Sequence, residues 1–161
     1  MLKLFLLRHG KAANPEDYDQ DYDRPLNKKG VIQINQVGFK LLNEENEISQ
    51  IISSSAKRTE ETTLIANHFL NVKDVEFHSH LYLSSHPHIF ESLQQLAKAD
   101  SVLYVGHNFG ISDIASYLTG ENVNMSTGML VEIEFEFDDW KMISKQSGRL
   151  IDSFAPDVFI P

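Results

Sequence analysis

Three short segments of the sequence carry histidine, arginine or serine side chains directly after an apolar run. They are Arg8-His9-Gly10, Ser53-Ser54-Ser55-Ala56-Lys57-Arg58 and Gly106-His107-Asn108. Arginine presents a planar fork of donors that matches the oxygens of a phosphate group. A neutral imidazole is a nucleophile, and cationic neighbours disfavour its protonation. Together the three segments would form a pocket that binds a phosphoryl group and transfers it to a histidine.

His9 is the candidate nucleophile of such a pocket. We expect Arg8, Arg58 and His107 to hold the charge on the phosphoryl oxygens while the group passes to His9. Water would then hydrolyse the phosphohistidine, which divides one difficult displacement into two easier ones. Neither step requires a metal ion or another cofactor.

The predicted elements place these residues at the ends of strands. Apolar runs predict strands over Leu2–Leu7 and Ser101–Val105, and short strands are predicted over Ile48–Ile52 and Val75–Phe77. In open α/β sheets ligands bind outside the carboxyl ends of the strands, so the three segments are expected to converge. Helices are predicted after an N-cap at Asn27, from about Ala56 to Phe69 with a cap from Ser53-Ser54-Ser55, around Ile89–Leu96, and from Ile111 to a C-cap at Gly120.

The C-terminal part alternates polar and apolar residues. Met129–Phe137 and Trp140–Ser144 are predicted to form an antiparallel hairpin that turns at Asp138-Asp139, and the tail Phe154–Pro161 is expected on the surface. The expected fold is a single domain over residues 1–161. It is a three-layer α/β/α sandwich with a mostly parallel central sheet and a C-terminal antiparallel hairpin.

Composition limits the class of protein. The chain has 161 residues, of which 42% are hydrophobic, and a net charge of −9. This charge opposes binding to nucleic acid or anionic lipid, so an anionic substrate needs a locally basic pocket. There is no cysteine, which excludes a thiol nucleophile and thiolate metal sites. The apolar start is too short for a signal peptide and no stretch is long enough to span a membrane, so we expect a cytoplasmic protein.

Four segments of the sequence form a combined pattern. They are Leu7-Arg8-His9-Gly10, Asp23-Arg24-Pro25-Leu26-Asn27 with Gly30, Ser53–Thr59 with Glu61-Thr62, and Gly106-His107-Asn108. In this combination the chain resembles the histidine phosphatase superfamily, and within it the small SixA-type phosphohistidine phosphatases. The resemblance implies that His9 accepts the phosphoryl group, that Arg8 and Arg58 bind it, and that His107 completes the pocket. It also implies a phosphoglycerate mutase-like fold.

The sequence departs from the family pattern in two respects. Larger members supply an acidic residue that protonates the leaving oxygen, and here only Glu91, His86 and His88 lie in the corresponding stretch. Lys11 follows the glycine of the first segment, and Phe109 replaces a proline often seen after Gly-His-Asn. Neither residue is expected to touch a catalytic atom, but both are placed to alter the rim of the pocket and the choice of substrate.

A site without a strong general acid suits a phosphoramidate, because a protonated phosphohistidine already has a good leaving group. We therefore expect the substrate to be a phosphohistidine on a protein, such as a phosphotransfer domain in signalling. The alternatives are a phosphatase for a small phosphorylated metabolite, and a non-catalytic module that binds a phosphorylated protein.

Several residues also have structural interpretations. Asp23-Arg24 is expected to be an ion pair that anchors the first helix, and the acidic run Asp17–Asp23 to be a solvated loop that repels small anions or docks a basic partner. Thr127-Gly128 is either a plain turn or part of the pocket rim. A histidine cluster is expected to be solvated rather than to bind metal; it consists of His78, His80, His86 and His88.

Overall fold

The structure of the protein is a computed structural model that describes residues 1–159. Within these residues six strands form one sheet in the order β3-β2-β4-β1-β5-β6. The first four strands of this order are parallel to one another, and β5 runs antiparallel to both β1 and β6. The strands are β1 (Leu2–Arg8), β2 (Gln50–Ser54), β3 (Asp74–His78), β4 (Ser101–Gly106), β5 (Leu130–Phe135) and β6 (Arg149–Phe154).

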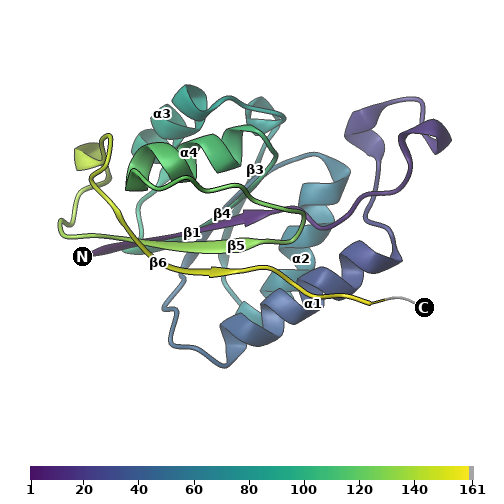
Figure 1. Cartoon of the computed structure of the whole chain (residues 1–161), viewed down its shortest axis with the longest axis horizontal. Coiled ribbons are helices and arrows are strands. Elements are labelled where there is room, and N and C mark those ends of the chain that lie inside the picture. Colours follow the sequence, from purple (N-terminus) through teal and green to yellow (C-terminus); the bar gives the residue numbers. More distant parts are fainter. Residues whose placement is uncertain (160–161) are drawn as a thin grey trace.

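Two pairs of helices cover the two faces of the sheet. Helices α1 (Lys28–Leu42) and α2 (Lys57–Leu70) lie below it in Figure 1, and α3 (His86–Leu96) and α4 (Gly110–Thr119) lie above it. The predicted three-layer α/β/α fold with a mostly parallel sheet is therefore confirmed. None of the described helices is long and apolar enough to cross a membrane.

Strand β1 is covered on both faces, which explains the uninterrupted apolar run Leu4–Leu7. Leu2, Leu4 and Leu6 belong to the hydrophobic core on the α3–α4 face, whereas Phe5 and Leu7 belong to the core on the α1–α2 face. Because successive side chains of a strand point to opposite faces, a strand that is covered on both sides needs apolar residues at every position. The central strand therefore anchors Arg8, its last residue, in the middle of the sheet.

The predicted helix caps are partly confirmed. The side chain of Asn27 accepts a hydrogen bond of 2.8 Å from the Gly30 N–H at the start of α1, and Gly120 ends α4 with a φ of 75°. The predicted serine cap of α2 is wrong. The N-cap residue is Ala56, which has no capping side chain, and Ser54 and Ser55 make other contacts.

The predicted second strand of the C-terminal hairpin is also wrong. Residues Trp140–Met142 form a short 3-10 helix (η4), because the Trp140 ring is buried in the core and donates a 2.8 Å hydrogen bond to the Ala99 carbonyl. The strand that pairs with β5 is β6, which begins at Arg149. Most side chains of this edge strand are exposed, so it lacks the apolar alternation that identified β5. The last two residues of the predicted surface tail, 160–161, lie outside the described residues.

Two glycines fasten the segment after β1 to the start of α1. A Cβ atom on Gly10 would lie 2.7 Å from the Gly30 carbonyl oxygen, and one on Gly30 would lie 2.2 Å from the Lys11 carbonyl oxygen. These separations leave no room for a side chain at either position. The Lys11 carbonyl also accepts a hydrogen bond from the Asn27 N–H at 2.9 Å. The first turn of α1 thus fixes the backbone immediately after His9.

Substituting Gly30→Ala should destabilise the protein although alanine favours helix. The new methyl group would meet backbone atoms that cannot turn away, and overpacking of this kind costs about 1–3 kcal/mol. For a chain of this size we expect the midpoint of thermal unfolding to fall by about 3–10 °C. Lys28→Ala, in the same helical turn but exposed, is the control. An unchanged midpoint for Gly30→Ala would show that the contact yields without strain.

Candidate active site

The register of the sheet brings the predicted residues together at the carboxyl ends of three strands. Arg8 of β1 pairs with Gly106 of β4, so His9 and His107, the next residues, are neighbours across the sheet. Their ring centroids lie 5.3 Å apart. Strand β2 lies on the other side of β4 and leads into α2, which carries Arg58 in its first turn. The structure therefore places Arg8, His9, Arg58 and His107 in one site.

The hydrogen bonds of His9 determine which of its nitrogens is free to react. Nδ1 lies 2.7 Å from the carbonyl oxygen of Gly10, which can only accept, so Nδ1 carries the proton. Nε2 then holds a lone pair, and it accepts a hydrogen bond of 3.3 Å from Nε of Arg58. The nucleophilic atom of His9 is therefore Nε2. Its orientation is set by the peptide that follows it in the chain.

Burial and positive charge keep His9 neutral. Burial is the largest cause, and together with Arg58, Arg8 and Arg24 it lowers the pKa of His9 to about 3 despite the opposing hydrogen bond to Gly10. Burial and Arg58 also lower the pKa of Arg8 from its ordinary value. A neutral imidazole among guanidinium groups is suited to accept an electrophilic, negatively charged group.

His107 is neutral as well and has a serine partner that the sequence did not reveal. Burial, followed by His9 and Arg58, lowers its pKa to about 2. Its Nε2 lies 2.8 Å from the hydroxyl of Ser54 at the end of β2. When that hydroxyl donates to Nε2, Nδ1 carries the proton. Nδ1 of His107 and Nε of Arg8 are both buried and have no hydrogen-bond partner within residues 1–159, which fits a pocket that supplies donors to an anion.

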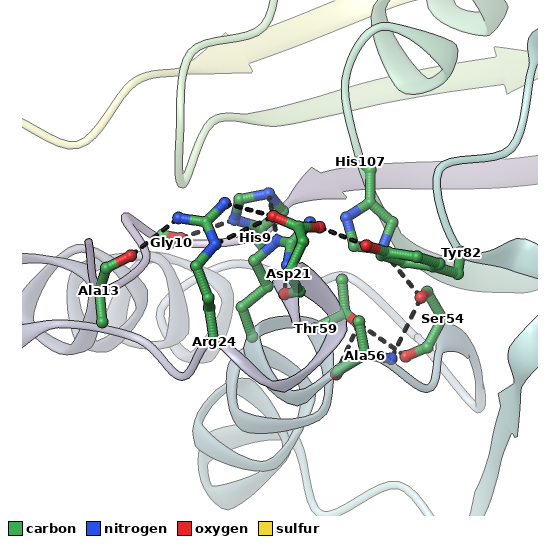
Figure 2. A network of polar contacts seen from close by, with 11 residues as sticks. His9, Gly10, Ala13, Asp21, Arg24, Ser54, Ala56, Thr59, Tyr82 and His107 are labelled. Atoms are coloured by element: carbon green, nitrogen blue, oxygen red, sulfur yellow. Dashed lines mark hydrogen bonds and ion pairs between the residues drawn. The ribbon is translucent and has the colours of Figure 1, made fainter. Parts of the chain in front are cut away.

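A carboxylate from the acidic loop also reaches the site. Asp21, in the short 3-10 helix η2 (Asp21–Asp23), accepts hydrogen bonds from Nη2 of Arg58 at 2.9 Å and from the Tyr82 hydroxyl through Oδ2. Its Oδ1 accepts from Nε and Nη2 of Arg24 at 2.9 and 2.8 Å. Its backbone carbonyl accepts from Nη1 of Arg58 at 2.7 Å. Figure 2 shows Asp21 between Arg24 and Tyr82, in front of His9.

This network keeps Asp21 ionised. Burial alone would raise the pKa of its carboxyl, but hydrogen bonds from Tyr82, Arg24 and Arg58 hold it well below its usual range. An ionised carboxylate cannot serve as a proton donor. The predicted ion pair between Asp23 and Arg24 is wrong, since Arg24 pairs with Asp21. The prediction that Asp17–Asp23 is a solvated loop is also wrong at Asp21, because this side chain bonds to Arg24, Arg58 and Tyr82.

The three residues considered as a general acid make their contacts elsewhere. Glu91 is exposed on α3 and accepts a hydrogen bond of 3.2 Å from Gln95. The His86 ring packs against Tyr117 with centroids 5.5 Å apart. Nε2 of His88 lies 3.1 Å from Nδ1 of His80. None of these contacts involves a residue of the site.

The histidine cluster does not form a metal cage. Among residues 1–159, no three histidine, aspartate or glutamate side chains are arranged so that they could hold a metal ion. Two of the cluster rings, His78 and His80, lie 5.2 Å apart, whereas His86 lies against α4.

Sequence reasoning missed Asp21, Tyr82 and Ser54. The spacing of Asp21 and Arg24, which is one turn of a 3-10 helix, was the one available signal. Tyr82 lies a few residues before His86, His88 and Glu91, and its ring packs edge-on against the His107 ring, with centroids 5.4 Å apart. Thr127-Gly128 also belongs to this region, because the Gly128 N–H donates to the carbonyls of Arg8 and His9 at 3.2 and 2.9 Å.

Nuclear magnetic resonance can test the protonation of His9. An unperturbed histidine has a pKa near 6.5, so at pH 5 it is mostly protonated. With its pKa lowered to about 3, His9 should keep the ¹⁵N shifts of a neutral ring with the proton on Nδ1 from pH 8 to pH 5. A titration midpoint of His9 near pH 6.5 would contradict the assignment.

The same two histidines should make the stability depend on pH. Below about pH 6.5 the unfolded chain binds protons on His9 and His107, whereas the folded chain does not. The free energy of unfolding should therefore decrease as the pH falls toward 3.

Asp21→Asn tests whether this carboxylate competes with an anionic ligand. The wild-type side chain occupies donors of Arg58 and neutralises part of the positive charge beside His9. We expect the dissociation constant for inorganic phosphate, measured by calorimetry, to fall by about tenfold, which is about 1.4 kcal/mol. Asp23→Asn removes the same charge from an exposed neighbour and should have a much smaller effect. Weaker phosphate binding by Asp21→Asn would mean that Asp21 mainly positions the arginines.

Comparisons with known proteins agree with this geometry. A sequence model of the histidine phosphatase superfamily (branch 1) matches residues 4–82, which contain Arg8, His9 and Arg58. The fold is similar to that of a protein from Agrobacterium tumefaciens assigned as phosphohistidine phosphatase SixA, with a TM-score of 0.84 and 24% identity over 96% of this chain and 98% of that one.

Two further structures have the same fold. The protein histidine phosphatase SixA, solved with tungstate, is similar with a TM-score of 0.82 and 24% identity over 96% of this chain and 97% of that one. A mycobacterial glucosyl-3-phosphoglycerate phosphatase is similar with a TM-score of 0.68 and 16% identity over 97% and 99% of the two chains. The family match over residues 4–82 and this shared architecture support membership of the histidine phosphatase superfamily and a phosphatase activity.

Proposed function

We propose that the protein removes the phosphoryl group from phosphohistidine on a partner protein, by way of a phosphohistidine formed on its own His9. The observation that carries the proposal is the state of the His9 ring. Its Nδ1 is tied to the Gly10 carbonyl, its Nε2 holds a lone pair, and burial among arginines keeps it neutral. A residue that only bound phosphate would not need this preparation.

The first step exchanges one P–N bond for another. The hydrogen bond between Nε of Arg58 and Nε2 of His9 gives way to the incoming phosphorus atom. Nε2 of His9 forms the new bond while the bond to the substrate imidazole breaks, and that imidazole leaves with the electron pair. The guanidinium groups of Arg8 and Arg58 and the His107 ring hold the phosphoryl oxygens throughout.

Water completes the reaction. It attacks the phosphorus atom, its proton passes to the phosphate product, and Nε2 of His9 regains its lone pair. The Gly10 carbonyl accepts from Nδ1 in the resting ring, and it is placed to stabilise the positive charge that the ring carries while phosphorylated. Arginine charge and a histidine nucleophile supply this chemistry without a metal ion.

The leaving group argues for phosphohistidine over a phosphate ester. An alkoxide needs a proton as it departs, but Glu91, His86 and His88 make their contacts away from the site, and Asp21 is ionised. A phosphohistidine protonated on its other ring nitrogen leaves as neutral imidazole and needs no acid. The likeness to the protein histidine phosphatase SixA supports the same substrate class. We propose that the protein acts in the cytoplasm, in phosphotransfer signalling.

Two substrates with different leaving groups test the proposal. We expect rapid release of phosphate from a phosphotransfer domain phosphorylated on histidine, and at least about a hundredfold lower kcat/KM for an alkyl phosphate ester, since a general acid contributes about 10²–10⁴. Ester hydrolysis at an equal or higher rate would favour a small phosphorylated metabolite as the substrate.

The variant His9→Ala should lose at least about a thousandfold of turnover, as expected for a nucleophile. His68→Ala, which removes an exposed histidine from α2, is the matched control and should behave as wild type. Rapid quenching with a radiolabelled carrier should trap the label on His9. Binding of the phosphorylated carrier with no phosphate release by the wild type would indicate a non-catalytic module instead.

A further inference from the structure

Residues 82–84 and residues 107–110 contact each other at two points and form part of the edge of the site. The Tyr82 ring lies edge-on to the His107 ring, with centroids 5.4 Å apart. Farther along both segments, a Cβ atom on Gly110 would lie 1.9 Å from the Ser84 carbonyl oxygen, so the two backbones are in close contact there. One residue of each segment is held near these contacts, namely Leu83 and Phe109.

Both of these residues direct a large apolar side chain into solvent. Leu83 is 54% exposed and Phe109 is 80% exposed. Apolar side chains exposed next to residues of a binding site are available for contact with the molecule that binds there. We call these two residues the Leu83–Phe109 rim.

The backbone at Leu83 adds an independent observation. Its φ is 50°, in the left-handed region that leucine rarely adopts, which costs about 1 kcal/mol or more. Glycine or asparagine would adopt this conformation at lower cost. The chain instead holds a leucine there and exposes it, although neither local conformation nor the hydrophobic core requires an apolar side chain at this position.

We propose that the Leu83–Phe109 rim is the docking surface for the folded protein that carries the phosphohistidine, and that it selects this carrier over small phosphorylated molecules. The inference rests on the proposed function. A phosphoryl group held between His9 and His107 leaves the rest of its substrate at the pocket mouth, beside the residues that follow Tyr82 and His107. The partner presents an apolar patch next to its phosphorylated histidine, which the leucine and the aromatic ring cover.

The test compares hydrolysis of the P–N bond of phosphohistidine in two substrates, a protein domain and the free amino acid. Leu83→Asn, Phe109→Ser and the double variant are assayed on a phosphotransfer domain phosphorylated on histidine and on free phosphohistidine. We expect kcat/KM on the domain to fall about tenfold for each single variant and further for the double variant, mainly through KM. Hydrolysis of free phosphohistidine should stay within about twofold of wild type. Asparagine tolerates the left-handed backbone, so Leu83→Asn should remain folded.

Leu42→Ser is the matched control, because Leu42 is 57% exposed, close to the exposure of Leu83, but lies at the end of α1. It should leave both activities unchanged. An equal loss of activity on both substrates would overturn the docking role, because the rim would then act on the pocket itself. Unchanged activity of the rim variants on the domain would also overturn it. If the wild type hydrolyses neither substrate, the proposed function fails and the docking proposal fails with it.

Discussion

The hydrogen bond between Nδ1 of His9 and the carbonyl of Gly10 is the interaction on which the site depends. It fixes the tautomer, so the lone pair lies on Nε2 and faces Arg58. It can form only because the backbone after β1 is held in place, and the close approach of Gly10 and Gly30 provides that restraint. Nε2 of His9 is thus prepared for attack by three features of the backbone: the buried central strand β1, the close approach of Gly10 and Gly30, and the Gly10 carbonyl.

The electrostatics of the site balance two opposing requirements. Burial and several nearby guanidinium groups keep the His9 imidazole neutral. The guanidinium groups also attract a phosphoryl group, but without counter-charge they would repel one another. Asp21 supplies that charge by bridging Arg24 and Arg58, and the Tyr82 hydroxyl completes its hydrogen bonding. The same carboxylate occupies donors that a phosphoryl group also needs. A substrate must therefore replace the bonds that Asp21 makes to Arg58, whereas Nε of Arg8 and Nδ1 of His107 have no partner within residues 1–159.

Leaving-group chemistry and the exposed apolar residues both support the proposed substrate, a phosphohistidine on a protein. The side chains that could have protonated a leaving oxygen are engaged on α3 and at η3 (Ser79–Leu81), away from His9. The segments that follow Tyr82 and His107 carry exposed apolar side chains instead. A phosphoramidate on a protein needs no proton donor and brings a surface of its own. In the proposed docking surface, Phe109 takes the place of the proline that is often seen after Gly-His-Asn.

The sequence by itself determined the layers of the fold and the four residues expected to do chemistry. Uninterrupted apolar runs identify strands buried on both faces, and polar residues at the ends of parallel strands must meet at one edge of the sheet. Only the tertiary structure decided that Asp21, Ser54 and Tyr82 join them, and that β6 rather than Trp140–Ser144 pairs with β5. Periodicity reports local burial, whereas the contacts of Asp21 with Arg58 and of Trp140 with Ala99 join residues far apart in the chain. Such contacts depend on packing that no short window of sequence contains.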